Sequence, residues 1–116
     1  MIAEKTITIC GKDVRLRYCA ATETGYEMNA KKSIADIDFR SQEDLIRLSI
    51  AAIVAAYEST DEQAPITSKD ILYDATPKEL IDMFTAVIEL RASWYDIPFV
   101  IKPEMEESKE DDSPNA

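Results

Sequence analysis

The chain has 116 residues, which leaves room for one domain around a single hydrophobic core. Apolar residues make up 46% of it and charged residues 31%, as in folded soluble domains. The formal net charge is −10, so the attraction that drives most nucleic-acid binding has the wrong sign, and we expect no nucleic-acid partner. The longest uncharged stretch, Leu48 to Tyr57, has about half the length of a membrane span. The first residues lack the apolar core of a signal peptide, so we expect a cytoplasmic protein that does not bind membranes.

Alternating β-branched residues near the amino terminus predict a β-hairpin over residues 5–19. Ile7 and Ile9 alternate with polar residues on the first arm, and Val14 and Leu16 do so on the second. Each arm therefore has one apolar face. The simplest register sets Ile9 opposite Val14 and Ile7 opposite Leu16.

Gly11 supplies the backbone freedom for a two-residue hairpin turn, most simply as Gly11-Lys12. A shift of this turn by one residue in either direction leaves Cys10 and Cys19 about four positions or more out of register. That separation exceeds the reach of a disulfide. We therefore expect two free thiols.

A polar helical segment follows over residues 20–32, with Thr22 as a candidate cap. Gly25 weakens this helix by about 1 kcal/mol relative to alanine. The strongest helical pattern covers residues 42–58, where Ser41 and Asp44 resemble a capping box. Because this segment is apolar nearly all round, it predicts a central helix buried on several sides.

The central helix also carries four small residues through which neighbouring helices could approach closely. Simple core burial and an oligomer seam both account for them, with core burial favoured. The four residues are Ala51, Ala52, Ala55 and Ala56.

Two further helices are predicted over residues 68–74 and 77–95. Thr67 precedes the first of them, and Thr76 is a good cap for the second. Pro77 then occupies the first helical position, and Glu79 stands three residues after the cap, both of which are typical helix starts.

Together these elements predict an α+β fold, mainly α, with an N-terminal β-hairpin packed on a bundle of about four helices. Residues 1–98 are expected to form a single globular domain. Residues 99–116 are rich in carboxylates and poor in large apolar residues, which predicts a flexible, disordered acidic tail.

The sequence offers little for catalysis. The absence of histidine removes the commonest general base and metal ligand. The two cysteines have no base in their surroundings to activate them, and the two glycines, Gly11 and Gly25, are too few for a phosphate-binding loop. Carboxylates lie on polar stretches, where we expect them to be solvated. We therefore predict no enzyme activity, no catalytic residue, no cofactor and no metal site.

Aromatic residues give the one positive indication of function. Trp94 and Tyr95 lie at the end of the last predicted helix, and Phe99 follows closely. Large aromatics near a flexible chain end are often anchors for a binding partner, so these three are the candidate partner-binding residues. The alternative is that they cover the core beneath the hairpin.

Taken in order, these elements resemble a known family. The opening TITICGKDVRLRYCAATETGYEMNAKKSI resembles the start of tail assembly chaperones from long-tailed phages and prophages. The stretches DLIRLSIAAIVAAYES and ITSKDILYDATPKELIDMFTAVIELRASW are similar to the central, short and last helices of that family. The resemblance covers roughly residues 5 to 95. Where the family often has TGKS, this chain has Lys31-Lys32-Ser33, without the glycine.

The resemblance implies a protein that binds and solubilises the tape measure protein during tail assembly, without catalysis. Such chaperones act in the bacterial host cytoplasm and are absent from the finished virion. A longer form made by translational frameshifting is common in the family. The alternative reading is a small acidic regulatory or secretion-type chaperone, or an inhibitor, that binds a different protein client. Self-association into a homo-oligomer stays open in both readings.

Overall fold

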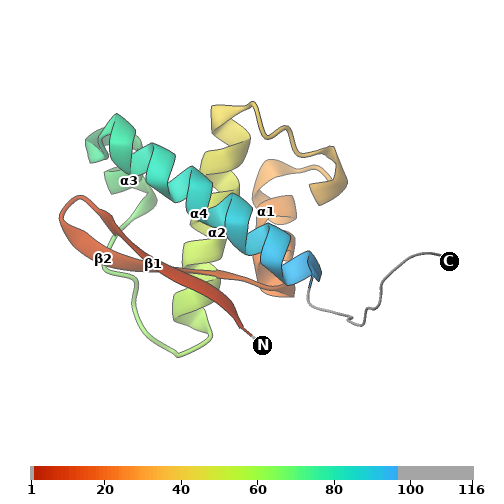
Figure 1. The fold of residues 1–116 in the computed structure, drawn as a ribbon, viewed down its shortest axis with the longest axis horizontal. Coiled ribbons are helices and arrows are strands. Elements are labelled where there is room, and N and C mark those ends of the chain that lie inside the picture. The colour runs from red at the N-terminus through yellow and green to blue at the C-terminus, as the bar shows by residue number, and fades with distance from the viewer. Residues whose placement is uncertain (1, 97–116) are drawn as a thin grey trace, which may run out of the picture.

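The computed structural model describes residues 2–96, which form a hairpin followed by four α-helices (Figure 1). The predicted fold class, α+β and mainly α, is confirmed over these residues. The predicted tail, residues 99–116, lies outside them, as does Phe99. The elements are β1 (Ala3–Ile9), β2 (Lys12–Tyr18), α1 (Ala20–Ala30), a short 3-10 helix η1 (Ile34–Asp36), α2 (Gln42–Glu58), α3 (Ser68–Asp74) and α4 (Pro77–Asp96).

The hairpin has a different register from the simplest one that the sequence predicts. Ile7 pairs with Val14 and not with Leu16, because the turn consists of Cys10-Gly11 and begins one residue earlier. Both turn residues have positive φ angles, 53° and 76°, as a type I′ turn requires. The register differs by two positions, so the same side chains still face the core, where Val14 and Leu16 are fully buried.

The sequence predicts Thr22 as the cap of α1, but the N-cap residue is Cys19, and Thr22 is the third helical residue of its capping box. The helix begins directly after Cys19, and Thr22 lies in its first turn, fully buried. Its hydroxyl accepts a hydrogen bond from the Cys19 N–H at 3.2 Å and donates one to the Arg17 carbonyl at 2.6 Å. Thr22 therefore ties the end of β2 to the start of α1, and the helix ends at Ala30, two residues earlier than predicted.

Helix α2 lies at the centre of the molecule, in contact with α1, β2 and α4. A Cβ atom on Gly25 of α1 would lie 3.6 Å from the Cβ of Ala51, so the two helices approach closely there. The four alanines of α2 are all buried within the chain. They serve core packing and are not available as a seam for a second copy.

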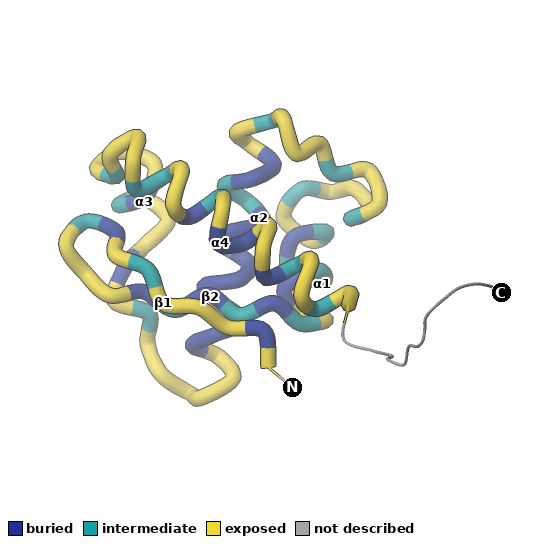
Figure 2. Tube along the Cα trace, viewed as in Figure 1, coloured by how far each residue is buried: buried dark blue, intermediate teal, exposed yellow. Residues whose placement is uncertain are grey.

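The core lies between α2, the inner face of the hairpin and α4, as the buried segments in Figure 2 show. Full burial of one such side chain contributes about 1.5–3 kcal/mol. The largest fully buried apolar side chains are Tyr18, Tyr26, Ile9, Leu16, Leu48, Met83, Val14 and Val87.

The predicted start of α4 is confirmed. The Thr76 hydroxyl accepts a hydrogen bond from the Glu79 N–H at 3.2 Å, and the Glu79 carboxylate accepts one from the Thr76 N–H at 2.9 Å. This reciprocal pair satisfies two of the backbone donors that a helix start leaves free. Pro77 follows as the first helical residue.

Candidate partner-binding groove

An apolar groove runs between α2 and α3. Its floor consists of Ile46, Ile50 and Val54 of α2, which are four residues apart and therefore lie along one face of the helix. The alanines of α2 and Ile53 face inward, whereas Ile46 and Ile50 are half-buried and Val54 is exposed on this side. The sequence predicts α2 to be buried on several sides, and this is the side that stays open.

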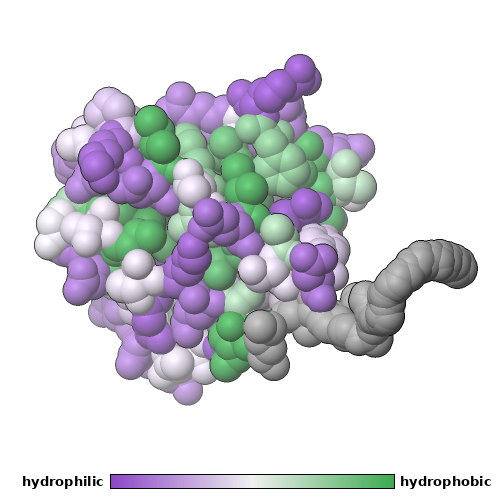
Figure 3. Space-filling model, viewed as in Figure 1, coloured by the Kyte–Doolittle hydropathy of each residue, from purple (hydrophilic) through white to green (hydrophobic). Residues whose placement is uncertain are grey.

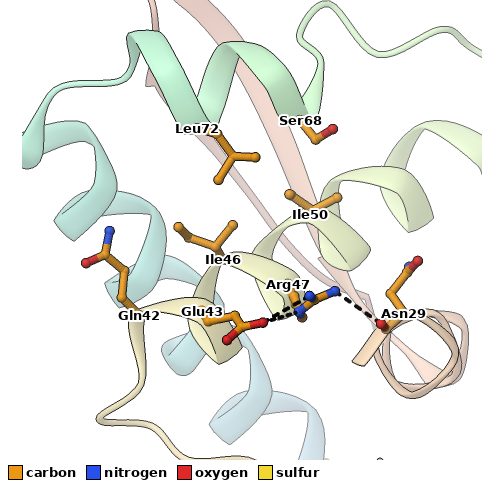
Figure 4. Close-up of a pocket in the computed structure, with 8 residues that line it drawn as sticks. All are labelled: Asn29, Gln42, Glu43, Ile46, Arg47, Ile50, Ser68 and Leu72. Atoms are coloured by element: carbon orange, nitrogen blue, oxygen red, sulfur yellow. Dashed lines mark hydrogen bonds and ion pairs between the residues drawn. The ribbon is translucent and has the colours of Figure 1, made fainter. Parts of the chain in front are cut away.

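Helix α3 forms the opposite wall of the groove. The Thr67 hydroxyl accepts from the Asp70 N–H at 3.1 Å and the Asp70 carboxylate accepts from the Thr67 N–H at 3.0 Å, which fixes the start of this two-turn helix. Ile71 packs into the core, and the next residue, Leu72, therefore projects outward with 58% of its surface exposed. Figure 4 shows the Leu72 side chain directed toward Ile46.

The rim of the groove that lies away from α3 is polar. The Arg47 guanidinium binds the Glu43 carboxylate at 3.0 Å and donates a second hydrogen bond to the Asn29 carbonyl at the end of α1, at 3.1 Å (Figure 4). These bonds hold the long arginine side chain along the rim. The apolar floor between Ile46 and Ile50 stays open to solvent as a result.

The groove consists of two neighbouring hollows. The larger has a volume of about 540 Å³ and lies between the first half of α2 and α3. The smaller, about 250 Å³, continues beside Val54 and Ile66 and shares Ile50 and Ser68 with the larger one. From Ile46 to Val54 the groove follows α2 for about 12 Å. An apolar helix with anchors on successive turns has the shape to fill it.

Of the three aromatic residues predicted to bind a partner, the structure describes two, and it places them differently. Trp94 is half-buried and packs against the core, with its ring centroid 5.5 Å from that of Tyr18. Tyr95 is 46% exposed on the outer side of α4. Neither lies in the groove between α2 and α3.

Polar and aromatic groups fix the orientation of Tyr95. The Glu23 carboxylate accepts hydrogen bonds from the Tyr95 and Tyr18 hydroxyls, the latter at 2.8 Å. The Arg91 guanidinium lies 4.7 Å from the Tyr95 ring centroid and 5.1 Å from that of Phe39. Burial, together with the bond to Glu23, raises the pKa of Tyr18, so this hydroxyl stays protonated as a donor.

The remaining chemical groups do not assemble a reactive centre in the part of the chain that is described. Cys10 and Cys19 are free thiols, as predicted. Burial raises the pKa of the Cys10 thiol, and the Glu79 carboxylate raises it further, so little thiolate forms near neutral pH. Among residues 2–96, no group of three or more cysteine, aspartate or glutamate side chains is placed to hold a metal ion. No helix within that range is long and apolar enough to cross a membrane.

Comparison with family models, with curated proteins and with solved structures found no match. Sequence reasoning missed the groove because α2 is apolar on nearly every side. Residue size gives no signal either, because Leu45, Leu48 and Ile53 are as large as the floor residues and are buried beside the alanines.

Proposed function

We propose that this protein is a non-catalytic assembly chaperone that holds an amphipathic helix of its client in the groove between α2 and α3. The observation that carries the proposal is the apolar line of Ile46, Ile50 and Val54, half-buried at the two isoleucines and exposed at Val54, with Leu72 of α3 directed toward Ile46 (Figure 4). An apolar groove bordered by polar groups is a common binding site for an amphipathic helix. Figure 3 shows apolar side chains exposed among polar ones on the face of the molecule that it draws.

The size of the groove favours a helix as the occupant. Two to three helical turns of the client would place residues at i, i+4 and i+7 over the floor. A backbone in helical form satisfies its own hydrogen bonds, so it can enter an apolar groove without a desolvation cost for its peptide groups. An extended peptide would need partners for these groups, and the described sides of the groove consist mainly of apolar side chains.

The net charge of −10 suits the same role. Complexes that carry like charge repel one another, which opposes the aggregation of a client whose own apolar surface is only partly covered. The chaperone would then act by covering apolar helices until their final partners assemble.

The resemblance to tail assembly chaperones supports the tape measure protein of a long-tailed phage or prophage as the client. That protein is a long helical chain, and the chaperone would bind it in the host cytoplasm and leave before the virion is complete. The second candidate is a small acidic regulatory or secretion-type chaperone, or an inhibitor, with a different protein client. The apolar groove is equally compatible with that role, so only the identity of the client separates the two.

Co-expression of the full chain with a tape measure protein from the same phage or prophage tests the proposal. We expect the tape measure protein to stay soluble and to co-purify. Leu72→Glu should reduce its recovery about tenfold or more, because the variant places a charge in the groove. Tyr73→Glu is the matched control, since Tyr73 is the next residue on α3, is 78% exposed, and does not line the groove.

Equal recovery with the Leu72 and Tyr73 variants would show that the groove does not bind the client. Failure of the wild-type chain to retain the tape measure protein would overturn this client assignment and favour the second candidate.

A further inference from the structure

The outer side of α4 carries a second apolar surface, separate from the groove. Its core-facing residues include Met83, Val87 and Leu90, which are buried. On a helix with 3.6 residues per turn, the opposite side should be polar in a protein that acts alone. In this chain that side carries an uncharged stripe whose members are all exposed (Figure 2): Ile81, Thr85, Ile88, Ala92 and Tyr95.

The spacing of this α4 stripe is that of a helix–helix seam. Its members stand at i, i+4, i+7, i+11 and i+14, which keeps them on one side of the helix over about 21 Å. Large and small residues alternate along it, since Thr85 and Ala92 lie between Ile81, Ile88 and Tyr95. A second helix with the same alternation can interlock with it, large residues against small ones.

Charges beside the α4 stripe are balanced, although the whole chain is strongly acidic. Lys78 binds Asp82 at 2.9 Å, and Lys5 of β1 binds Glu89. Asp82, beside the first residue of the stripe, and Glu89, beside its middle, thus each have a lysine partner, which lowers the repulsion between two copies facing each other here. Asp96 lies near the far end of the helix from Lys78, about 27 Å along its axis, so these two cannot pair within one chain.

We propose that the α4 stripe binds the α4 stripe of a second copy of this chain, with the two helices antiparallel. In this arrangement Ile88 lies opposite Thr85 of the second copy, and Ile81 lies opposite Ala92. The same two-fold arrangement brings Lys78 next to Asp96 of the second copy, once at each end. The contact is isologous, so it closes at two copies.

The size of the stripe predicts a weak dimer. A surface about 21 Å long on a helix about 10 Å wide has a footprint on the order of 200 Å² per copy. Stable complexes bury about 800 Å² per partner. We therefore expect a weak, reversible dimer that forms only at high protein concentration. The proposal is independent of the client groove, which lies on α2 and α3.

Sedimentation velocity of the full chain over about 5–500 µM tests the dimer. We expect the weight-average mass to rise toward that of two chains. Ile88→Glu should leave the protein monomeric over this range, and Ile81→Glu, at a more exposed position, should do the same. Tyr73→Glu, an exposed site on α3, should dimerise like the wild type. Circular dichroism establishes that each variant is folded.

A charge exchange tests the antiparallel arrangement. Lys78→Glu and Asp96→Lys should each weaken the dimer severalfold, whereas the double variant should recover most of the loss. A wild-type chain that stays monomeric at 500 µM would overturn the proposal. Dimerisation that survives both isoleucine variants would also overturn it, and a double variant weaker than either single one would refute the antiparallel arrangement.

Discussion

The Glu79 carboxylate, in the first turn of α4, accepts a hydrogen bond from the backbone N–H of Cys10 at the tip of the hairpin, at 3.0 Å. Its other oxygen accepts from the Thr76 N–H. One side chain therefore caps α4 and fixes the hairpin turn to that helix. The two segments it joins are 69 residues apart in the sequence.

Replacing Glu79 with alanine should lower the free energy of unfolding by about 2 kcal/mol, because two backbone donors lose a charged acceptor. Glu79→Gln should cost less, since the amide oxygen can keep one of the two bonds. Urea denaturation of each variant measures the effect. Glu89→Ala, which removes only a surface ion pair with Lys5, is the control and should have almost no effect. Equal losses for Glu79→Ala and Glu89→Ala would contradict the dual role of Glu79.

Replacement of the two glycines by alanine should change the stability of the protein in opposite directions. Gly11 has a φ of +76°, so Gly11→Ala should destabilise the protein by about 1–2 kcal/mol although no atom lies near the added Cβ. Gly25 lies within α1, where an added Cβ would contact the Ala51 Cβ at an ordinary 3.6 Å. Gly25→Ala should therefore raise stability by up to about 1 kcal/mol. Thermal unfolding of both variants measures these changes. A loss of stability in Gly25→Ala would show that α1 and α2 are too close for the added methyl group.

Helix starts were predictable because their signals are local. Ser41, Thr67 and Thr76 each precede a helix and accept a hydrogen bond from the N–H three residues later, as the sequence indicated. The hairpin turn was harder to place. Glycine identifies one turn residue, but the second left-handed position is filled by Cys10, a residue type that rarely adopts this conformation. The turn therefore begins one residue earlier than composition suggests.

The apolar surfaces could not be predicted as surfaces. Along α2, a nearly continuous apolar sequence does not reveal which side faces solvent, since that depends on where α3 packs. Along α4, the helical spacing of Leu80, Ile81, Phe84, Val87 and Ile88 predicts one buried stripe that includes both Ile81 and Ile88. The structure corrects this, because both are exposed. The hairpin packs on the other side of α4, which leaves Ile81 and Ile88 exposed to solvent.

Replacing Trp94 with alanine should lower the free energy of unfolding clearly more than replacing Tyr95 does. Trp94 is half-buried and contacts the Tyr18 ring, so Trp94→Ala should lower the free energy of unfolding by about 2 kcal/mol. Tyr95→Ala should cost less than about 1 kcal/mol, because its ring is largely on the surface. Urea denaturation measures both. A Trp94 variant of unchanged stability that no longer captures a partner would instead make Trp94 a binding anchor.

Asp44, at the start of α2, should make stability depend on pH in a narrow acidic range. Its carboxylate, almost fully buried, accepts hydrogen bonds from the Lys32 ammonium at 2.8 Å and from the Asp38 N–H at 2.9 Å. The Lys32 bond, followed by the Asp38 bond, lowers the pKa of Asp44 below its ordinary value. The unfolded state therefore takes up this proton more readily than the folded state does.

The resulting stabilisation is complete above about pH 5 and is lost as the pH falls below about 4, through the lowered pKa of the folded state. Urea denaturation of the wild type and of Asp44→Asn from pH 7 to pH 3 isolates this group, because other acid effects are common to both. We expect a constant difference in unfolding free energy down to about pH 5 and a shrinking one below pH 4. In Lys32→Met the loss on acidification should be smaller, since the main cause of the lowered pKa is gone and the folded and unfolded states then take up this proton more equally. A difference that stays constant to pH 3 would show that Asp44 has the same pKa in both states.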